Sequence, residues 1–113
     1  MAITYEKLFQ PFMLATTDST LFTNNKAAGT ILRGGRVRVT NVTNAARQYT
    51  IYCVPSAGSS STTNAAPLTK SIAAFQYEDV DIPLMAVGDS LVAKADAATS
   101  VNIQAIAGAY FTP

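Results

Sequence analysis

The sequence predicts an all-β protein: an antiparallel two-sheet sandwich, jelly-roll-like, with about eight short strands. Short segments of alternating apolar and polar residues are separated by turn residues, and no apolar stripe of helical period is sustained. The segments recur about every ten residues, which is typical of sandwiches. The chain has 113 residues, of which 49% are hydrophobic and 13% charged. We therefore expect a single β-sandwich domain, residues 1–113, with its own core.

Residues 1–12 fit the strand pattern least well. They form either an N-terminal arm that reaches a neighbouring subunit or a covering strand of the sandwich, and both alternatives stay open. Glu6 and Lys7 do not fit a secretory signal, and no apolar run approaches the length of a membrane span. We therefore expect the chain to fold in the cytoplasm. This segment carries Tyr5, Leu8, Phe9 and Phe12, which could make contacts with a neighbouring subunit.

Alternation is clearest in the first half of the chain. In residues 36–42, "RVRVTNV", Val37 and Val39 face the core and the arginines between them face outward. Residues 47–54, "RQYTIYCV", are fairly apolar on both faces, so this strand should be central. The four residues between these segments are short enough to close a hairpin. The expected strands lie within residues 10–25, where there are two, and within 36–42, 47–54, 69–75, 77–83, 89–95 and 101–111.

The second half contains two further features. Residues 97–113 have no charge, whereas exposed edge strands are usually protected by charges, proline or a bulge. This stretch should therefore be central, covered, or paired with another subunit. Residues 56–67 are small and neutral, and we expect them to form a loop that projects from the sandwich.

Composition restricts the chemistry. The chain has no histidine and one cysteine, Cys53, so a Ser-His-Asp triad, a Cys-His pair and a histidine-ligated metal site are excluded. Cys53 alternates with Ile51 and Tyr49 on a core face, which favours a structural role. An enzyme using Asp79 and Asp81 is the weakest alternative. We predict no catalytic residues, no cofactor and no metal.

The charged residues suggest contacts with a partner protein and not catalysis. The net charge of +1 gives no long-range field for nucleic acid or a membrane, so neither is an expected partner. "RGGRVR" brings Arg33, Arg36 and Arg38 together, but one copy of this motif is a weak nucleic-acid signal. We expect a turn at the two glycines and outward arginines that pair with carboxylates of a partner. Asp79 and Asp81 should form a solvated face or bind a partner's cations.

Several phrases, taken in order, resemble a family of small β-sandwich virion proteins of tailed bacteriophages, which includes capsid cement and decoration proteins. The phrases cover about residues 10–108 and read "STLFTNN", "VRVTNVTNAARQYTIYCVPSAG" and "DIPLMAVGDSLVAKADAATSVNIQAIAG". Where related sequences have a Val-Pro-x-Gly turn, this chain reads "TNNKAAG". The resemblance implies a structural role in a virion and supplies no catalytic residues.

We therefore expect a capsid cement or decoration protein that binds and stabilises a phage head. Its partners would be the major capsid protein and itself, as a homotrimer or homodimer, on the capsid surface of a virion assembled in the host bacterial cytoplasm. The alternatives are a tail or fibre module that binds receptors, and a sugar-binding module that uses Tyr49, Tyr52, Tyr77 or Tyr110. The expected interface residues are Tyr5, Leu8, Phe9, Phe12, Arg33, Arg36, Arg38, Ile106, Tyr110 and Phe111.

Overall fold

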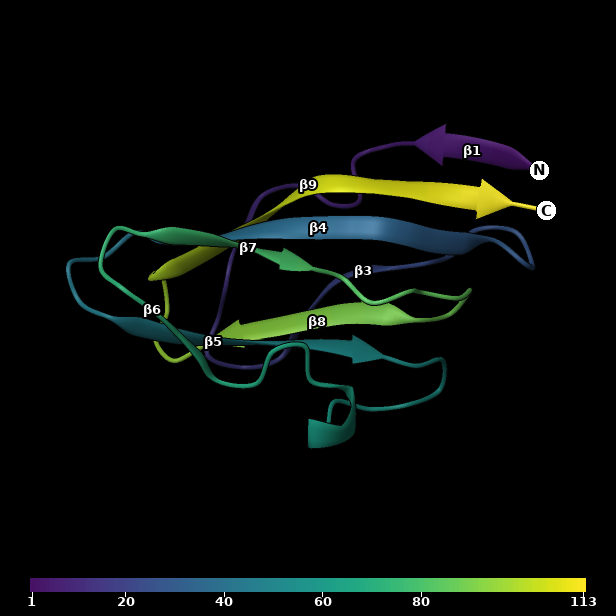
Figure 1. Cartoon of the computed structure of the whole chain (residues 1–113). Coiled ribbons are helices and arrows are strands. Elements are labelled where there is room, and N and C mark those ends of the chain that lie inside the picture. Colours follow the sequence, from purple (N-terminus) through teal and green to yellow (C-terminus); the bar gives the residue numbers. More distant parts are fainter.

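A computed structural model describes all residues, 1–113, and confirms the predicted fold class. The chain forms nine strands and one short 3₁₀ helix (Figure 1). The elements are β1 (Ala2–Tyr5), β2 (Phe12–Met13), β3 (Ser19–Thr23), β4 (Ile31–Asn41), β5 (Arg47–Val54), η1 (Thr62–Asn64), β6 (Lys70–Ile72), β7 (Tyr77–Asp81), β8 (Ser90–Ala95) and β9 (Val101–Thr112).

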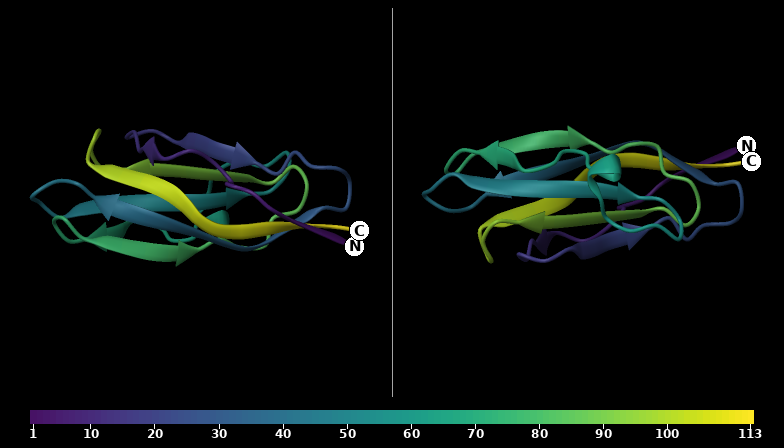
Figure 2. Two further views of the ribbon diagram at one scale, coloured as in Figure 1. Left: turned by 90° about the horizontal axis from the view of Figure 1, so that it is seen from above. Right: turned by 90° about the horizontal axis from the view of Figure 1, so that it is seen from below.

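The strands form two antiparallel sheets stacked face to face (Figures 1 and 2). Sheet A has the order β1-β9-β4-β7, and β2 also pairs with β9. Sheet B has the order β3-β8-β5-β6. Pairing is nested, because β4 pairs with β9 while β5 pairs with β8. This nesting makes the sandwich jelly-roll-like.

The core lies between the two sheets and follows the alternation seen in the sequence. Val37 and Val39 are fully buried, as predicted, and Tyr49 and Ile51 face them from sheet B. Cys53 is half-buried and packs against this core, as expected. β4 also contributes Leu32, and the other strands contribute Ile72, Leu91, Ala93, Ala95, Val101, Ile103 and Tyr110.

The predicted hairpin between residues 36–42 and 47–54 is wrong. β4 belongs to sheet A and β5 to sheet B, so the chain crosses between the layers instead of turning back within one. The crossing places the apolar faces of the two strands opposite each other. The buried Asn41 side chain stabilises it by donating to the carbonyls of Ala45 (2.8 Å), Ile72 (3.1 Å) and Ala73 (3.2 Å).

The uncharged C-terminal stretch is a central strand. β9 lies between β4 on one side and β1 and β2 on the other. β1 pairs with Ala109–Thr112 and β2 with Asn102 and Ile103, so the N-terminal segment is a covering element of its own sandwich. Residues 104–108 of β9 have no strand partner on that side.

The first part of the loop of residues 56–67 projects as expected, since residues 56–59 and 61–63 are exposed, whereas its last residues fold back on sheet B. Its end returns to β5, where Ile51 donates to the carbonyl of Pro67 (3.0 Å) and accepts from the amide of Ala66 (2.6 Å). Ala65 packs on a second, smaller apolar cluster of Tyr52, Val54 and Val92 on the outer face of sheet B. Burial of this cluster explains the folding back of the loop.

Candidate interface on the outer face of sheet A

One half of the outer face of sheet A is charged and satisfied internally. On β4 and β7, Arg36 Nε donates to Asp81 Oδ1 (2.8 Å), and Arg38 binds Asp79 through two bonds of 2.8 and 3.2 Å. The Arg38 guanidinium also lies 4.4 Å from the centre of the Tyr77 ring. We call these five residues the charged half. The carboxylates that we expected from a partner come instead from the same chain.

The ion pair between Arg38 and Asp79 favours the ionised form of Asp79. The Arg38 guanidinium lowers the pKa of Asp79 below its usual value, chiefly through the hydrogen bond. Asp79 and Asp81 each face an arginine of their own, so they do not form a pair of free carboxylates for a cation or for acid–base chemistry. No group of three or more residues among histidine, cysteine, aspartate and glutamate is placed to hold a metal ion.

The other half of this face is apolar and uncovered. Register places Ile3, Phe111 and Ile31 in one cross-strand row. The next row contains Tyr5, Ala109 and Arg33. Ile3 is 50% exposed and Tyr5 80%. We call these six residues the apolar half.

Arg33 is the cation of the apolar half. Its guanidinium lies 5.1 Å from the centre of the Phe111 ring, and no carboxylate of the chain forms an ion pair with it. A guanidinium above an aromatic ring keeps its N–H donors available at the surface. Arg33 can therefore bind a carboxylate that another molecule supplies.

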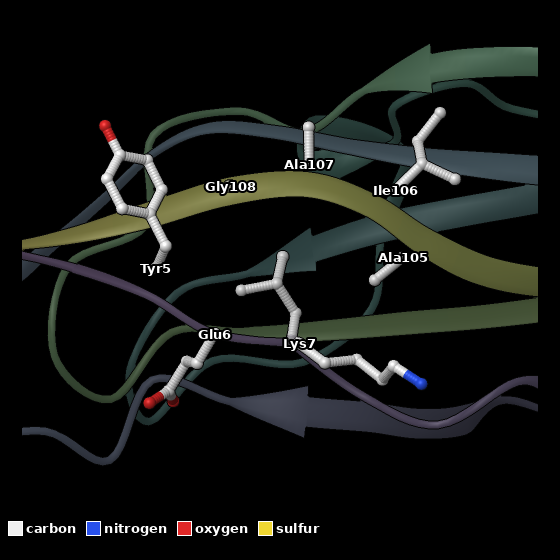
Figure 3. A pocket seen from close by; sticks show the side chains of 8 residues that line it. Tyr5, Glu6, Lys7, Ala105, Ile106, Ala107 and Gly108 are labelled. Atoms are coloured by element: carbon white, nitrogen blue, oxygen red, sulfur yellow. The ribbon is translucent and has the colours of Figure 1, made fainter.

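Small residues of β9 make a groove beside this patch. A groove of about 500 Å³ runs between residues 5–8 and residues 105–108. Figure 3 shows Tyr5 and Ile106 at its two ends, with Ala107 and Gly108 between them. A second groove, of about 430 Å³, reaches across to Arg33 and Phe111 and shares Tyr5, Ala107 and Gly108 with the first.

Gly108 is needed for the shape of the floor. Its φ of +147° lies outside the range that side chains readily adopt, and a Cβ there would lie 3.1 Å from Leu8 Cδ1. Gly34 and Gly35 form a bulge in β4 opposite this point, where the register with β9 shifts. The glycines predicted as a turn thus lie within a strand, and Gly34 lines the second groove.

The structure divides the predicted interface residues into three groups. Tyr5, Arg33, Ile106 and Phe111 come together around the grooves, and Phe12 is exposed farther along β9. Arg36 and Arg38 lie in the charged half. The remaining three, Leu8, Phe9 and Tyr110, are buried in the core of their own chain. Of these, only Leu8 lines a groove, so Phe9 and Tyr110 do not belong to the interface.

Ile3 belongs to the patch but was missed. The alternation of Ile3 with Tyr5 was a signal for a strand with one apolar face, although residues 1–12 as a whole showed no period. Ile31 was missed because it precedes the clear alternation of residues 36–42.

Other candidate sites have less structural support. Burial raises the pKa of the Cys53 thiol, which disfavours the reactive thiolate. Tyr49, Tyr52 and Tyr110 are buried and cannot stack on a sugar. Tyr77 is exposed, but Arg38 covers one face of its ring. No helix is long and apolar enough to cross a membrane.

Comparison with known proteins shows the fold. No protein-family model and no curated protein matches the chain. A chain of the Bacillus endospore appendages, described as disulfide-linked pili, is 14% identical, with a TM-score of 0.59 over 97% of this chain and 88% of that one. A chain of infectious bursal disease virus, Gt strain, is 14% identical with a TM-score of 0.55 over 96% of this chain.

A third similar structure is the VP2 protein of infectious bursal disease virus in derived T=1 particles, with 14% identity and a TM-score of 0.51 over 96% of this chain. The present chain spans about a third of the length of these two virus chains, 32% and 30%. At this identity the similarity establishes a shared sandwich fold.

Proposed function

We propose that the chain is a structural virion protein, a cement or decoration protein that binds and stabilises a bacteriophage head as a homo-oligomer. The observation that carries the proposal is the uncovered apolar half of sheet A. The chain covers the apolar cluster on the outer face of sheet B with its own loop, but nothing in the chain covers Ile3 and Tyr5. Contiguous exposed apolar surface of this kind marks a contact site.

The composition of the patch suits a protein contact. Tyrosine and arginine are enriched among the residues that contribute most to binding, and the patch has Tyr5 and Arg33 on the two sides of Ala109. A carboxylate of the partner would form an ion pair with Arg33, and an apolar side chain of the partner would fill the groove above Gly108. Because a shell offers many equivalent sites, modest contacts from each copy would add up through avidity.

The near-neutral charge also fits close packing of copies. With a net charge of +1, neighbouring copies on a shell do not repel one another at long range. The sequence phrases that resemble phage virion proteins support the same role. The major capsid protein as partner, the homotrimer or homodimer, and the location on the capsid surface all belong to this proposal.

Add-back to purified heads tests the proposal. Heads assembled without the chain should lose DNA at lower temperature than complete heads, and added wild-type chain should restore their resistance. Tyr5→Ala should bind weakly and restore little. The matched control is Tyr77→Ala, which removes an exposed tyrosine from the charged half of the same face and should restore resistance fully.

Two results would contradict the proposal. If heads without the chain resist heating as well as complete heads, the protein does not cement them. If labelled chain is found only at the tail of intact virions, a tail or fibre module replaces the head protein. Cryo-electron microscopy of the virion distinguishes these locations directly.

A further inference from the structure

The N-terminal segment consists of two parts with opposite environments. All four residues of β1, Ala2–Tyr5, are exposed, and none belongs to the core. After Glu6 and Lys7 come Leu8 and Phe9, which are buried, each with 9% exposure. The Leu8 side chain lies over Gly108, and Phe9 stacks on Phe22 with ring centroids 5.7 Å apart. Residues 8 and 9 are therefore an anchor, whereas β1 is attached only at the surface.

Contacts with β9 hold β1 in place. It pairs in the register Ala2↔Thr112 to Tyr5↔Ala109. The next residue, Glu6, forms an ion pair of 2.6 Å with Lys26, which also lies 4.9 Å from the Tyr110 ring centre. Because β1 buries little apolar surface, detaching it would sacrifice mainly backbone hydrogen bonds. The same bonds are available on β9 of any other copy.

The edge beneath β1 must remain covered. β9 has no charge along its length, so an open edge at residues 109–112 would present unpaired backbone groups on an apolar strand. Other edges of the molecule are protected: β7 has three acidic residues, β6 has only three residues, and β3 is irregular between Thr20 and Phe22. β1 itself has no charged side chain, proline or bulge. Residues 109–112 of β9 are therefore best covered by a β1 strand, which either their own chain or a second copy can supply.

We propose that β1 is exchanged between copies in the assembled protein, so that β1 of one chain pairs with β9 of a second chain. The register is the one seen within the single chain. Leu8 and Phe9 stay in their own core, and Glu6 and Lys7 form the hinge, since both are exposed and neither lies in a strand. Exchange of an identical element is a low-cost route to oligomers. The inference rests on the proposed self-association and names the segment that carries it.

Disulfide trapping tests the exchange. In a Cys53→Ser background, one chain carries Ala2→Cys and a second, differently tagged chain carries Thr112→Cys. These positions are register partners. The two chains are produced together, oxidised and separated without reductant. Exchange predicts a shift from one-chain to two-chain products that contain both tags. Ala2→Cys with Gln104→Cys is the matched control, because residue 104 lies outside the β1 pairing, and it should give no mixed product.

A locked chain provides the second arm. Ala2→Cys and Thr112→Cys in the same chain, oxidised while the protein is dilute, should tie β1 to its own β9 and prevent the oligomer that the reduced protein forms. Light scattering reports the oligomer. If the locked chain still assembles, or if Ala2→Cys chains link only to one another, exchange is overturned. If the wild-type chain forms oligomers but the Ala2→Cys and Thr112→Cys chains form no mixed disulfide, exchange alone is rejected. The proposed function is tested separately, by the heat resistance of the heads.

Discussion

The outer faces of the two sheets differ in what covers them. On sheet B, Tyr52, Val54 and Val92 are apolar and the chain folds Ala65 of its own loop over them. On sheet A, the apolar half is equally free of carboxylates, but no loop crosses it (Figures 1 and 2). The same kind of surface is therefore internal structure on one side and available surface on the other. We therefore expect the first face to contribute to stability and the second to the proposed contact with a partner.

Replacing a tyrosine by alanine on each face should give the largest difference between a role in stability and a role in contact. Tyr52→Ala removes a buried ring and should lower the free energy of unfolding by about 2–4 kcal/mol. Tyr5→Ala removes an exposed ring and should change it by less than about 0.5 kcal/mol. Urea unfolding of both variants measures the difference. If Tyr5→Ala proves as damaging as Tyr52→Ala, the apolar half is part of the fold and the distinction between the faces disappears.

The covered face was partly readable from the sequence. Residues 47–54 are apolar on both faces, which already required a second cover besides the core. Ala65, near the end of the loop of residues 56–67, supplies it, but nothing in the composition of the loop indicates that its end folds back while its first part projects. The return depends on hydrogen bonds between Ile51 and residues 66–67, which local pattern does not encode.

On the outer face of sheet A, the sequence predicted the orientation of side chains only within single strands. Alternation correctly predicted that Arg36 and Arg38 face outward and Val37 inward. It did not predict which strand lies alongside, because register and sheet order are set by packing across the whole chain. The pairing of β4 with β7, which joins each arginine to an aspartate, was therefore invisible. For the same reason, periodicity could not distinguish exposed Tyr5 from buried Leu8.

Filling the groove should have the next largest effect. Gly108→Ala adds a Cβ close to Leu8 at an unfavourable φ and should lower the free energy of unfolding by about 1–3 kcal/mol. Gly34→Ala is the control, because its φ of +66° is also unfavourable but no atom lies within 4 Å of the added Cβ. The excess cost in Gly108→Ala combines the contact with Leu8 and the greater backbone strain of an alanine at a φ of +147°. Equal costs would mean that Leu8 is not anchored over the groove.

The tie between the two sheets predicts a pH dependence. The Tyr49 hydroxyl on sheet B donates to the Glu78 carboxylate on sheet A, and burial followed by this bond raises the pKa of Tyr49. Tyr49→Phe should therefore lower the free energy of unfolding by about 1–2 kcal/mol at neutral pH.

At high pH the two proteins should converge. Above about pH 10, the ordinary tyrosine value, the unfolded chain loses the Tyr49 proton while the folded chain keeps it. The contribution of Tyr49 is thus complete below that pH and is lost as the pH rises toward the raised pKa. Some decline remains in the variant, because burial also raises the pKa of Tyr110. A constant difference from pH 7 to pH 11 would show that the Tyr49 hydroxyl is not held by Glu78.

The smallest effects should come from the charged half of sheet A. Arg38→Ala should destabilise the chain more than Arg36→Ala, because Arg38 makes two bonds to Asp79 and lies on Tyr77, whereas Arg36 makes one bond to the more exposed Asp81.

The lowered pKa of Asp79 predicts a pH dependence of stability. The contribution of Asp79 to the free energy of unfolding is present above its usual pKa of 3.8 and is lost as the pH falls through the lower folded value. The difference between wild type and Asp79→Asn should therefore shrink in acid, and also at about 1 M salt, where charges are screened within about 3 Å. Thermal unfolding across pH and salt measures both trends.

Head binding by Arg38→Ala at neutral pH should match wild type, because the charged groups of this half already form ion pairs within the chain. A loss of binding with the fold intact would extend the interface over the whole outer face of sheet A.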